Sequence, residues 1–118
     1  MYLLKALWVW FFLLAMGLPV SAQYAFTINS PDTNTVTITA YTGSGGDVSI
    51  PDSIDGRTVT VIGSGAFASS SVTAVSIPDL VIFIGNQAFY NCGSLTNISL
   101  PSGITTLEEE TFNYCRAL

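Results

Sequence analysis

Two aspartates at matching places along the chain offer the most direct route to chemistry. Asp52 and Asp79 each follow a proline, Pro51 and Pro78, that closes a short apolar segment. If these segments stack, the two carboxylates lie close enough to share a proton or to hold Ca²⁺. Aspartate is also favoured after proline in solvated turns, and we prefer this interpretation because Ser102 interrupts the column in the next segment.

Other catalytic chemistry has few residues to work with. The chain contains no histidine, and its only lysine is Lys5. A Ser-His or Cys-His pair is therefore excluded within this sequence, and beyond residue 22 so is a lysine base. Residues 23–118 contain two basic residues, Arg57 and Arg116, and eight acidic residues, so their net charge is −6. They offer no basic patch for nucleic acid. We expect no catalytic residues, no cofactor and no nucleic-acid partner.

Two cysteines allow two interpretations. Cys92 and Cys115 are 23 positions apart and occupy the same phase of adjacent repeats. In-phase residues of stacked strands lie about 4.8 Å apart, which permits a disulfide between them. Parallel, inward side chains favour the alternative, in which both residues are small buried apolar groups. Two cysteines without histidine do not supply the four ligands of a structural metal site, so we predict no metal.

Two further motifs favour structure over chemistry. Gly43-Ser44-Gly45-Gly46 would cradle phosphate only if a helix with a lysine followed, but a strand-like segment follows, so we predict a turn. Glu108-Glu109-Glu110 precedes a predicted helical turn, where the helix dipole favours acidic side chains. This explains the three glutamates better than a metal site does.

A 23-residue period positions all of these residues. Ile77-Pro78 recurs as Leu100-Pro101, and Phe89 and Cys92 recur 23 positions later. Self-similarity at such a spacing is typical of solenoids, in which each repeat forms one coil and stacking supplies the core. An earlier, less regular copy contains Ile50-Pro51 and five extra residues around Asp55-Gly56. We expect this insertion to be a surface loop.

Each repeat also contains columns of core residues. Phe67, Phe89 and Phe112 form an aromatic column whose phase places it in the core rather than on a sugar-stacking surface. A second apolar column contains Ile62, Ile84 and Leu107. We expect Gly63 and Gly85 to permit the corner after this column, and the segments SGAFAS, NQAFYN and EETFNY to form single helical or 3-10 turns.

Outward strand positions are the candidate binding residues. They are small or polar, and they comprise Ser49, Ala74, Ser76, Asn97 and Ser99. Tyr90 and Tyr114 lie next to the aromatic column and are further contact candidates. Asn97-Ile98-Ser99 is also an N-glycosylation sequon, which matters only in a host that glycosylates it. A flat surface of such small side chains binds weakly at each repeat, so affinity must be summed over many repeats.

The N-terminal segment predicts export. Lys5 is followed by the apolar run ALWVWFFLLAMGL and by Val20-Ser21-Ala22, which together are typical of a secretory signal peptide over residues 1–22. An uncleaved membrane anchor is the alternative, although the run is shorter than the roughly 20 residues that span a bilayer. Membrane contact is expected only through this segment. Residues 23–46 predict a β-hairpin cap followed by the glycine-rich turn.

Residues 47–118 carry a family resemblance. The stretch IPDLVIFIGNQAFYNCGSLTNISLP and its continuation closely resemble BspA-like (Treponema pallidum-type) leucine-rich repeats over about Val48–Leu118. Departures are the missing cysteine in the first repeat and Glu108, where glycine is usual. The resemblance implies a mainly β leucine-rich-repeat solenoid of three repeats, the last truncated, with short helical or 3-10 turns. It also implies a secreted or cell-surface protein that binds an extracellular protein or glycan and carries no catalytic motif.

Two alternatives to a binding and adhesion module stay open. The repeats can be an accessory region of a larger exported enzyme, or they can be a structural surface spacer without a specific ligand. The chain stops at Leu118 in the middle of a repeat, so we expect it to be an N-terminal fragment of a longer protein.

Overall fold

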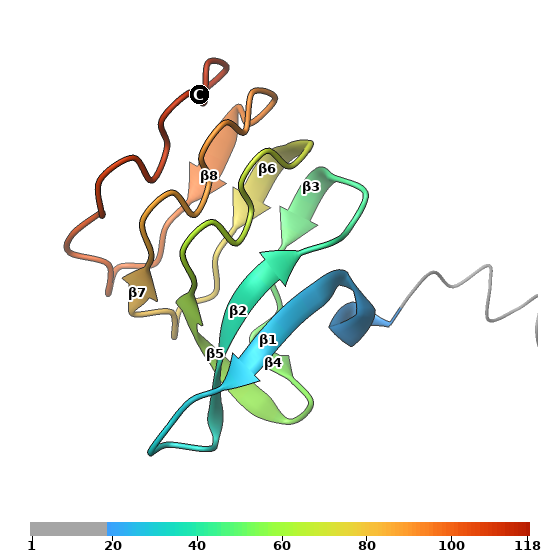
Figure 1. Cartoon of the computed structure of the whole chain (residues 1–118), viewed down its shortest axis with the longest axis vertical. Helices are drawn as coiled ribbons and strands as arrows, with labels where there is room; N and C mark the ends of the chain where they lie inside the picture. Colours follow the sequence, from blue (N-terminus) through green and yellow to red (C-terminus); the bar gives the residue numbers. More distant parts are fainter. Residues whose placement is uncertain (1–18) are drawn as a thin grey trace, which may run out of the picture.

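The computed structural model describes residues 19–118, so residues 1–18 of the predicted signal peptide, which covers residues 1–22, lie outside the described part (Figure 1). A short 3-10 helix, η1 (Val20–Gln23), comes first. The strands that follow are β1 (Tyr24–Ile28), β2 (Thr35–Tyr41), β3 (Gly46–Ser49), β4 (Ser53–Ile54), β5 (Arg57–Ile62), β6 (Val72–Ser76), β7 (Phe83–Ile84) and β8 (Asn97–Ser99). Within residues 19–118, no helix has the length and apolar character needed to cross a membrane.

The strands form two sheets, to which successive coils contribute one strand at a time. β3, β6 and β8 run parallel in one sheet (Figure 1). The other sheet has the order β1-β2-β5-β4, and β7 pairs in parallel with β5. Strands that are parallel and adjacent in a sheet, but separated in the chain by one full repeat, define a solenoid. The predicted mainly β repeat fold is confirmed.

The N-terminal hairpin is joined directly to the repeats. β1 pairs antiparallel with β2, and β2 then pairs in parallel with β5. Val36 and Ile38 are fully buried against the first coil, whereas Ile28 at the end of β1 is 49% exposed. The hairpin therefore continues the solenoid sheet and covers the apolar face of the first coil, as a capping element must.

The five-residue insertion of the first coil forms a second, smaller hairpin. β4 pairs antiparallel with β5 through the two-residue turn Asp55-Gly56. Both residues have positive φ angles, 50° and 74°, as tight hairpin turns of this kind require. The predicted surface loop is thus a hairpin that projects from the coil.

The segments between the sheets, where we expected single helical or 3-10 turns, are consecutive tight turns closed by hydrogen bonds between residues three positions apart. Backbone hydrogen bonds join Ala66 N to Gly63 O (3.2 Å) and Ala68 N to Gly65 O (3.0 Å), and the pattern recurs in the next two coils. Gly65, Gln87 and Glu110 have positive φ angles at equivalent positions. A left-handed residue interrupts a right-handed helix, so the helix-dipole explanation for the glutamates does not hold.

Gly63 and Gly85 are required for a different reason from the one we expected. Neither has a positive φ angle. Instead, the backbone of one coil approaches the next closely here, because Gly85 N donates to Ile62 O at 2.8 Å. A Cβ atom on Gly85 would lie 2.6 Å from the backbone nitrogen of Ser64. Only glycine tolerates this approach.

A column of stacked aromatic rings runs through the core. The ring centroids of Tyr41 and Phe67 are 4.9 Å apart, those of Phe67 and Phe89 are 5.0 Å apart, and those of Phe89 and Phe112 are 5.6 Å apart. The interplanar angles in these pairs are 16°, 20° and 14°. Tyr24 packs against Tyr41 and Phe67, and its burial raises its pKa to about 12. The hairpin therefore adds tyrosines to a column in which sequence analysis placed only phenylalanines.

The second apolar column is interrupted in the last coil. Ile62 and Ile84 are buried as predicted, but Leu107 is 47% exposed. Leu100 is likewise 40% exposed, although Ile77 at the equivalent place is buried. No further coil in the described part of the chain packs over the outer side of this coil, and these two leucines are open to solvent, although Pro101 and Thr111 of the same coil are buried.

Cys92 and Cys115 are free thiols in the structure, and the disulfide alternative stays a prediction that thiol alkylation tests. Each thiol donates a hydrogen bond to the preceding coil, Cys92 Sγ to Phe67 O and Cys115 Sγ to Phe89 O, both at 3.0 Å. Cys92 is fully buried, whereas Cys115 is partly exposed. The cysteines therefore act as small core residues that also satisfy a carbonyl group of the coil below.

Replacing Phe89 with alanine tests the importance of the aromatic column. Phe89 is fully buried and stacks on a ring on either side, so its loss leaves a cavity within the column. We expect Phe89→Ala to lower the free energy of unfolding by about 3–5 kcal/mol. Phe112→Ala should cost less, because Phe112 is only partly buried. Urea unfolding of the unmodified chain and of the two variants measures both effects. Equal losses of unfolding free energy in the two variants would contradict this order.

Thiol alkylation tests the state of the cysteines. Burial raises the pKa of the Cys115 thiol, so its reactive thiolate forms at higher pH than that of a free cysteine. We expect iodoacetamide to modify Cys115 before Cys92 in the native protein, and the rate at Cys115 to reach half of its plateau at a higher pH than the rate for a free cysteine peptide. Mass spectrometry of the digested protein measures both sites. Modification of neither cysteine until a reductant is added would show that they are bonded to each other.

Candidate binding face on the parallel strands

The outward side chains of β3, β6 and β8 form two straight rows. Ser49, Ser76 and Ser99 are direct partners across the three strands and make the first row. The second row is Asp47, Ala74 and Asn97. Neighbouring strands in a sheet lie about 4.8 Å apart, so each row presents side chains at a regular, close spacing. We refer to these six residues as the strand face.

Alternation along each strand separates the strand face from the core. Val72 and Val75 of β6 are buried, Ala74 is half-buried, and Ser76 is exposed. Asn97 and Ser99 of β8 are exposed, as is Ser49 of β3. The structure therefore brings all five of the predicted contact positions together on one surface: Ser49, Ala74, Ser76, Asn97 and Ser99.

Asp47 completes the strand face, and sequence analysis did not select it. Its carboxylate accepts a hydrogen bond from Thr73 Oγ1 at 2.7 Å, and its side chain is exposed. The available signal was its position, because Asp47 lies two residues before Ser49 and therefore points to the same side of the strand. It supplies the one charge in the two rows.

The backbone beneath the strand face is held by the ladder between coils. Ile50 N donates to Ser76 O at 3.0 Å, and Ile77 N donates to Ser99 O at 3.1 Å. These bonds hold the end of each strand against the adjacent strand, two residues before the proline. The serine row is thus rigid, and it offers three hydroxyl groups, each of which can donate and accept hydrogen bonds.

The two predicted contact tyrosines lie elsewhere. Tyr90 and Tyr114 are in the turn segments before the strands, and their rings meet edge to face at a centroid distance of 5.4 Å. Tyr114 is 49% exposed, and the guanidinium of Arg116 lies 6.0 Å from its ring centroid. This pair is a separate exposed aromatic feature and adds nothing to the strand face.

The acidic residues do not gather into a centre of their own. Asp52 and Asp79 are both exposed, in line with solvated turns. The carboxylate of Glu110 accepts a hydrogen bond from Gln87 Nε2 of the preceding coil. Among residues 19–118, no group of three or more histidine, cysteine, aspartate or glutamate residues is placed to hold a metal ion. The chemistry of the site is therefore that of hydroxyl, amide and carboxylate groups on a flat β surface.

Solved structures with this architecture come from several bacteria. The chain is similar to the leucine-rich repeat protein TpLRR of T. pallidum, with 33% identity and a TM-score of 0.79 over 86% of this chain and 47% of that one. A leucine-rich cell surface protein from Faecalibacterium prausnitzii shows 34% identity and a TM-score of 0.72 over 82% of this chain and 28% of that one. A leucine-rich repeat protein from Bacteroides ovatus shows 26% identity and a TM-score of 0.71, over 81% of this chain and 27% of that one. The chain thus spans less than half the length of each of these three proteins.

A family model identifies the repeats themselves. The search of curated proteins found no match. The model described as "BspA type Leucine rich repeat region (6 copies)" matches residues 35–118, which begin at β2 and include every coil. Since this match covers well over half of the sequence and agrees with the stacked parallel strands, the chain belongs to the BspA-type leucine-rich repeat family.

Proposed function

We propose that this chain is part of an exported, non-enzymatic binding module whose strand face contacts an extracellular protein or glycan. The observation that carries the proposal is the pair of rows on β3, β6 and β8, where small and polar side chains repeat across three parallel strands. Such a surface has no bulky side chain to obstruct a partner and many groups that form hydrogen bonds. It suits an extended ligand that makes the same weak contact at each coil.

Three further observations support the proposal, two for export to a surface and one for binding over catalysis. The N-terminal segment has the residue pattern of a secretory signal peptide. One of the similar structures is described as a cell surface protein. The described residues offer hydroxyl and carboxylate groups. They include no histidine, no lysine and no cluster of acidic residues placed to hold a metal ion, which favours binding over catalysis.

A structural spacer is the second candidate function. The serines of the strand face are so small that they also suit a surface that avoids contacts altogether. The chain spans 47% and 28% of the first two similar proteins, so an enzymatic domain in a longer protein is a third candidate. A panel of immobilised extracellular matrix proteins and a glycan array, probed with the full chain, separate the first candidate from the second.

Bulky substitutions in the serine row test which face binds. We expect Ser76→Trp with Ser99→Trp to lower the signal for any partner found in the panel at least about tenfold, because two large side chains then stand in the middle of a flat contact surface. Both positions are exposed, so the fold should tolerate the change.

Ser64→Trp provides the matched control, because Ser64 is an exposed serine in a turn outside the strand face. The control should bind as the unmodified chain does. Equal binding by all three proteins would show that the contact lies on another surface and would remove the strand face from the proposal.

A further inference from the structure

Three large apolar side chains of the second coil point into solvent. Leu80 is 62% exposed, Ile82 is 68% exposed and Phe83 is 45% exposed. We call these three residues the apolar patch. They belong to the coil whose strand β6 has a partner on either side, β3 and β8. Within the described strands, β7 pairs only with β5 and forms an edge of its sheet.

The solenoid does not require apolar residues at these positions. The equivalent residues 23 positions later are Gly103, Thr105 and Thr106, and all three are exposed. In the preceding coil, Val61 is the strand partner of Phe83 and is only half-buried. The coil thus folds with glycine or threonine at these places, and the apolar patch has no counterpart in the core.

The backbone beneath the apolar patch is fixed. Val81 N donates to Pro78 O at 3.1 Å, which closes a turn with Leu80 at its tip. Ile82 N donates to Thr60 O at 2.9 Å, and Phe83 pairs with Val61. Val81 and Ile84 on either side are buried in the core. The exposed side chains are therefore presented on a rigid support, which lowers the entropic cost of binding a partner.

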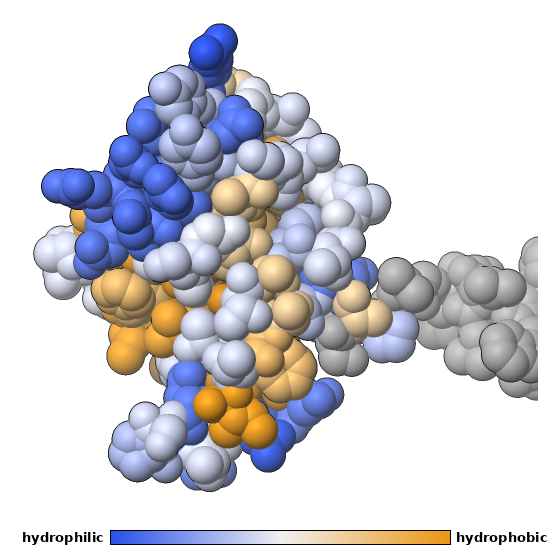
Figure 2. All heavy atoms as spheres, viewed as in Figure 1, coloured by the Kyte–Doolittle hydropathy of each residue, from blue (hydrophilic) through white to orange (hydrophobic). Residues whose placement is uncertain are grey.

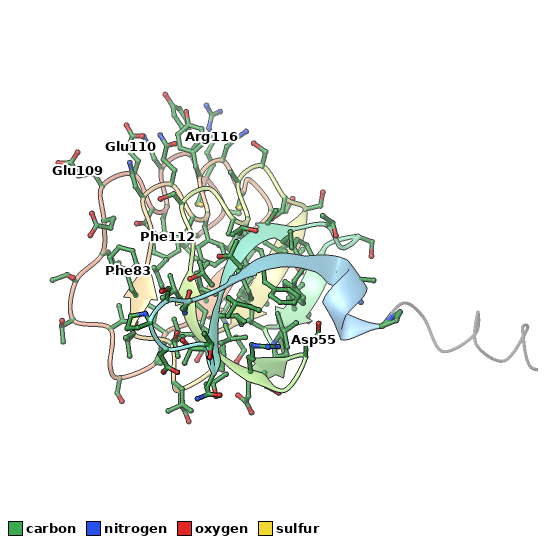
Figure 3. The ribbon with its side chains drawn as sticks, turned by 60° about the horizontal axis from the view of Figure 1, so that its bottom comes forward. Asp55, Phe83, Glu109, Glu110, Phe112 and Arg116 are labelled. Carbon is green, nitrogen blue, oxygen red and sulfur yellow. The ribbon has the colours of Figure 1, made fainter. Side chains whose placement is uncertain are left out.

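Acidic residues flank the apolar patch. Asp79 precedes it directly in the same turn, and Glu108 and Glu109 are exposed in the next coil, after Leu107. Figure 2 shows a hydrophilic area on the C-terminal coil next to the hydrophobic side chains beside β7, and Figure 3 places Phe83 and Glu109 on the same side of the molecule.

Both basic residues of the described chain are engaged elsewhere. The guanidinium of Arg57 donates to Thr33 O at 2.9 Å, and that of Arg116 lies over the Tyr114 ring. The apolar patch with its acidic border therefore carries uncompensated negative charge.

We propose that the apolar patch binds a cationic amphipathic segment of a partner protein. Burying the three apolar side chains supplies affinity, and the border of Asp79, Glu108 and Glu109 selects a partner with lysine or arginine beside its apolar residues. A second copy of this chain fits less well, because it would bring two acidic borders together. The surface is distinct from the strand face, which belongs to the other sheet.

A labelled amphipathic peptide of lysine and leucine provides the probe, and its lysines are replaced by glutamate in a matched second probe. Fluorescence anisotropy measures binding of each peptide to the full chain. We expect the lysine peptide to bind and the glutamate peptide not to bind. Ile82→Thr with Phe83→Thr should weaken binding of the lysine peptide at least about tenfold without any change in charge.

The chain supplies the controls for this experiment. Thr105 and Thr106 already occupy the equivalent positions, so the double threonine variant should fold, as circular dichroism can check. Ile28→Thr removes an apolar side chain that is 49% exposed on β1 and should leave the affinity unchanged. Glu108→Gln with Glu109→Gln should weaken binding and reduce its dependence on salt.

Three results would overturn the proposal. They are equal affinity of the folded double threonine variant, equal binding of the glutamate peptide, and a dimer of the chain that the double threonine substitution converts to monomer. The last result would identify the apolar patch as a self-association surface. Ser76→Trp with Ser99→Trp should not affect the lysine peptide, so failure here and failure of the proposed strand-face function are distinguishable.

Discussion

The structure depends on the requirement that each coil must cover the apolar interior of its neighbour. A single coil buries only part of its own apolar side chains. Stacking between coils buries the rest, as in the aromatic column, where Phe89 is stacked between Phe67 and Phe112. The same contacts fix the backbone, because Phe67 N donates to Ala88 O at 2.7 Å and Phe89 N donates to Thr111 O at 3.0 Å. Side-chain stacking and the backbone ladder therefore enforce one register. Residues 22 or 23 positions apart lie next to each other in the aromatic column, and residues 26 or 27 apart do so where β3 pairs with β6 across the insertion. Every surface feature inherits this register.

The repeated register explains why some features follow from sequence. Residues in phase must lie together once the coils stack, so the aromatic column was predicted from the repeats, and the serine row from the place of each serine before an apolar-proline pair. The two-residue turn at Asp55-Gly56 was also accessible, because the residue types that adopt positive φ angles are few. Five of the six residues of the strand face thus followed from the repeats and the alternation of β-strands, whereas Asp47 was missed.

Features that depend on contacts between unlike segments were not accessible in this way. Tyr41 belongs to the hairpin and follows no repeat, yet its ring stacks on Phe67. The turns around Gln87 and Glu110 were expected to be single helical or 3-10 turns. The left-handed conformation of these two residues was not expected, because non-glycine residues rarely adopt it. Leu107 was assigned to the core by its phase, but a column position is buried only where another coil packs over it. In each case the outcome is decided by a neighbour in space and not by the residue type.

A solenoid separates the demands of folding from those of binding more completely than most folds do. Inward positions are constrained by two neighbouring coils, whereas outward positions touch only solvent and the adjacent side chains of the same row. Leu80, Ile82 and Phe83 can therefore differ from Gly103, Thr105 and Thr106 without altering the coil beneath them. Exposed apolar side chains reduce solubility and gain nothing for the core, so a group of three at positions where the next coil has glycine and threonine requires a reason outside the fold. Contact with a partner is such a reason, and the acidic residues on either side restrict which partner it can be.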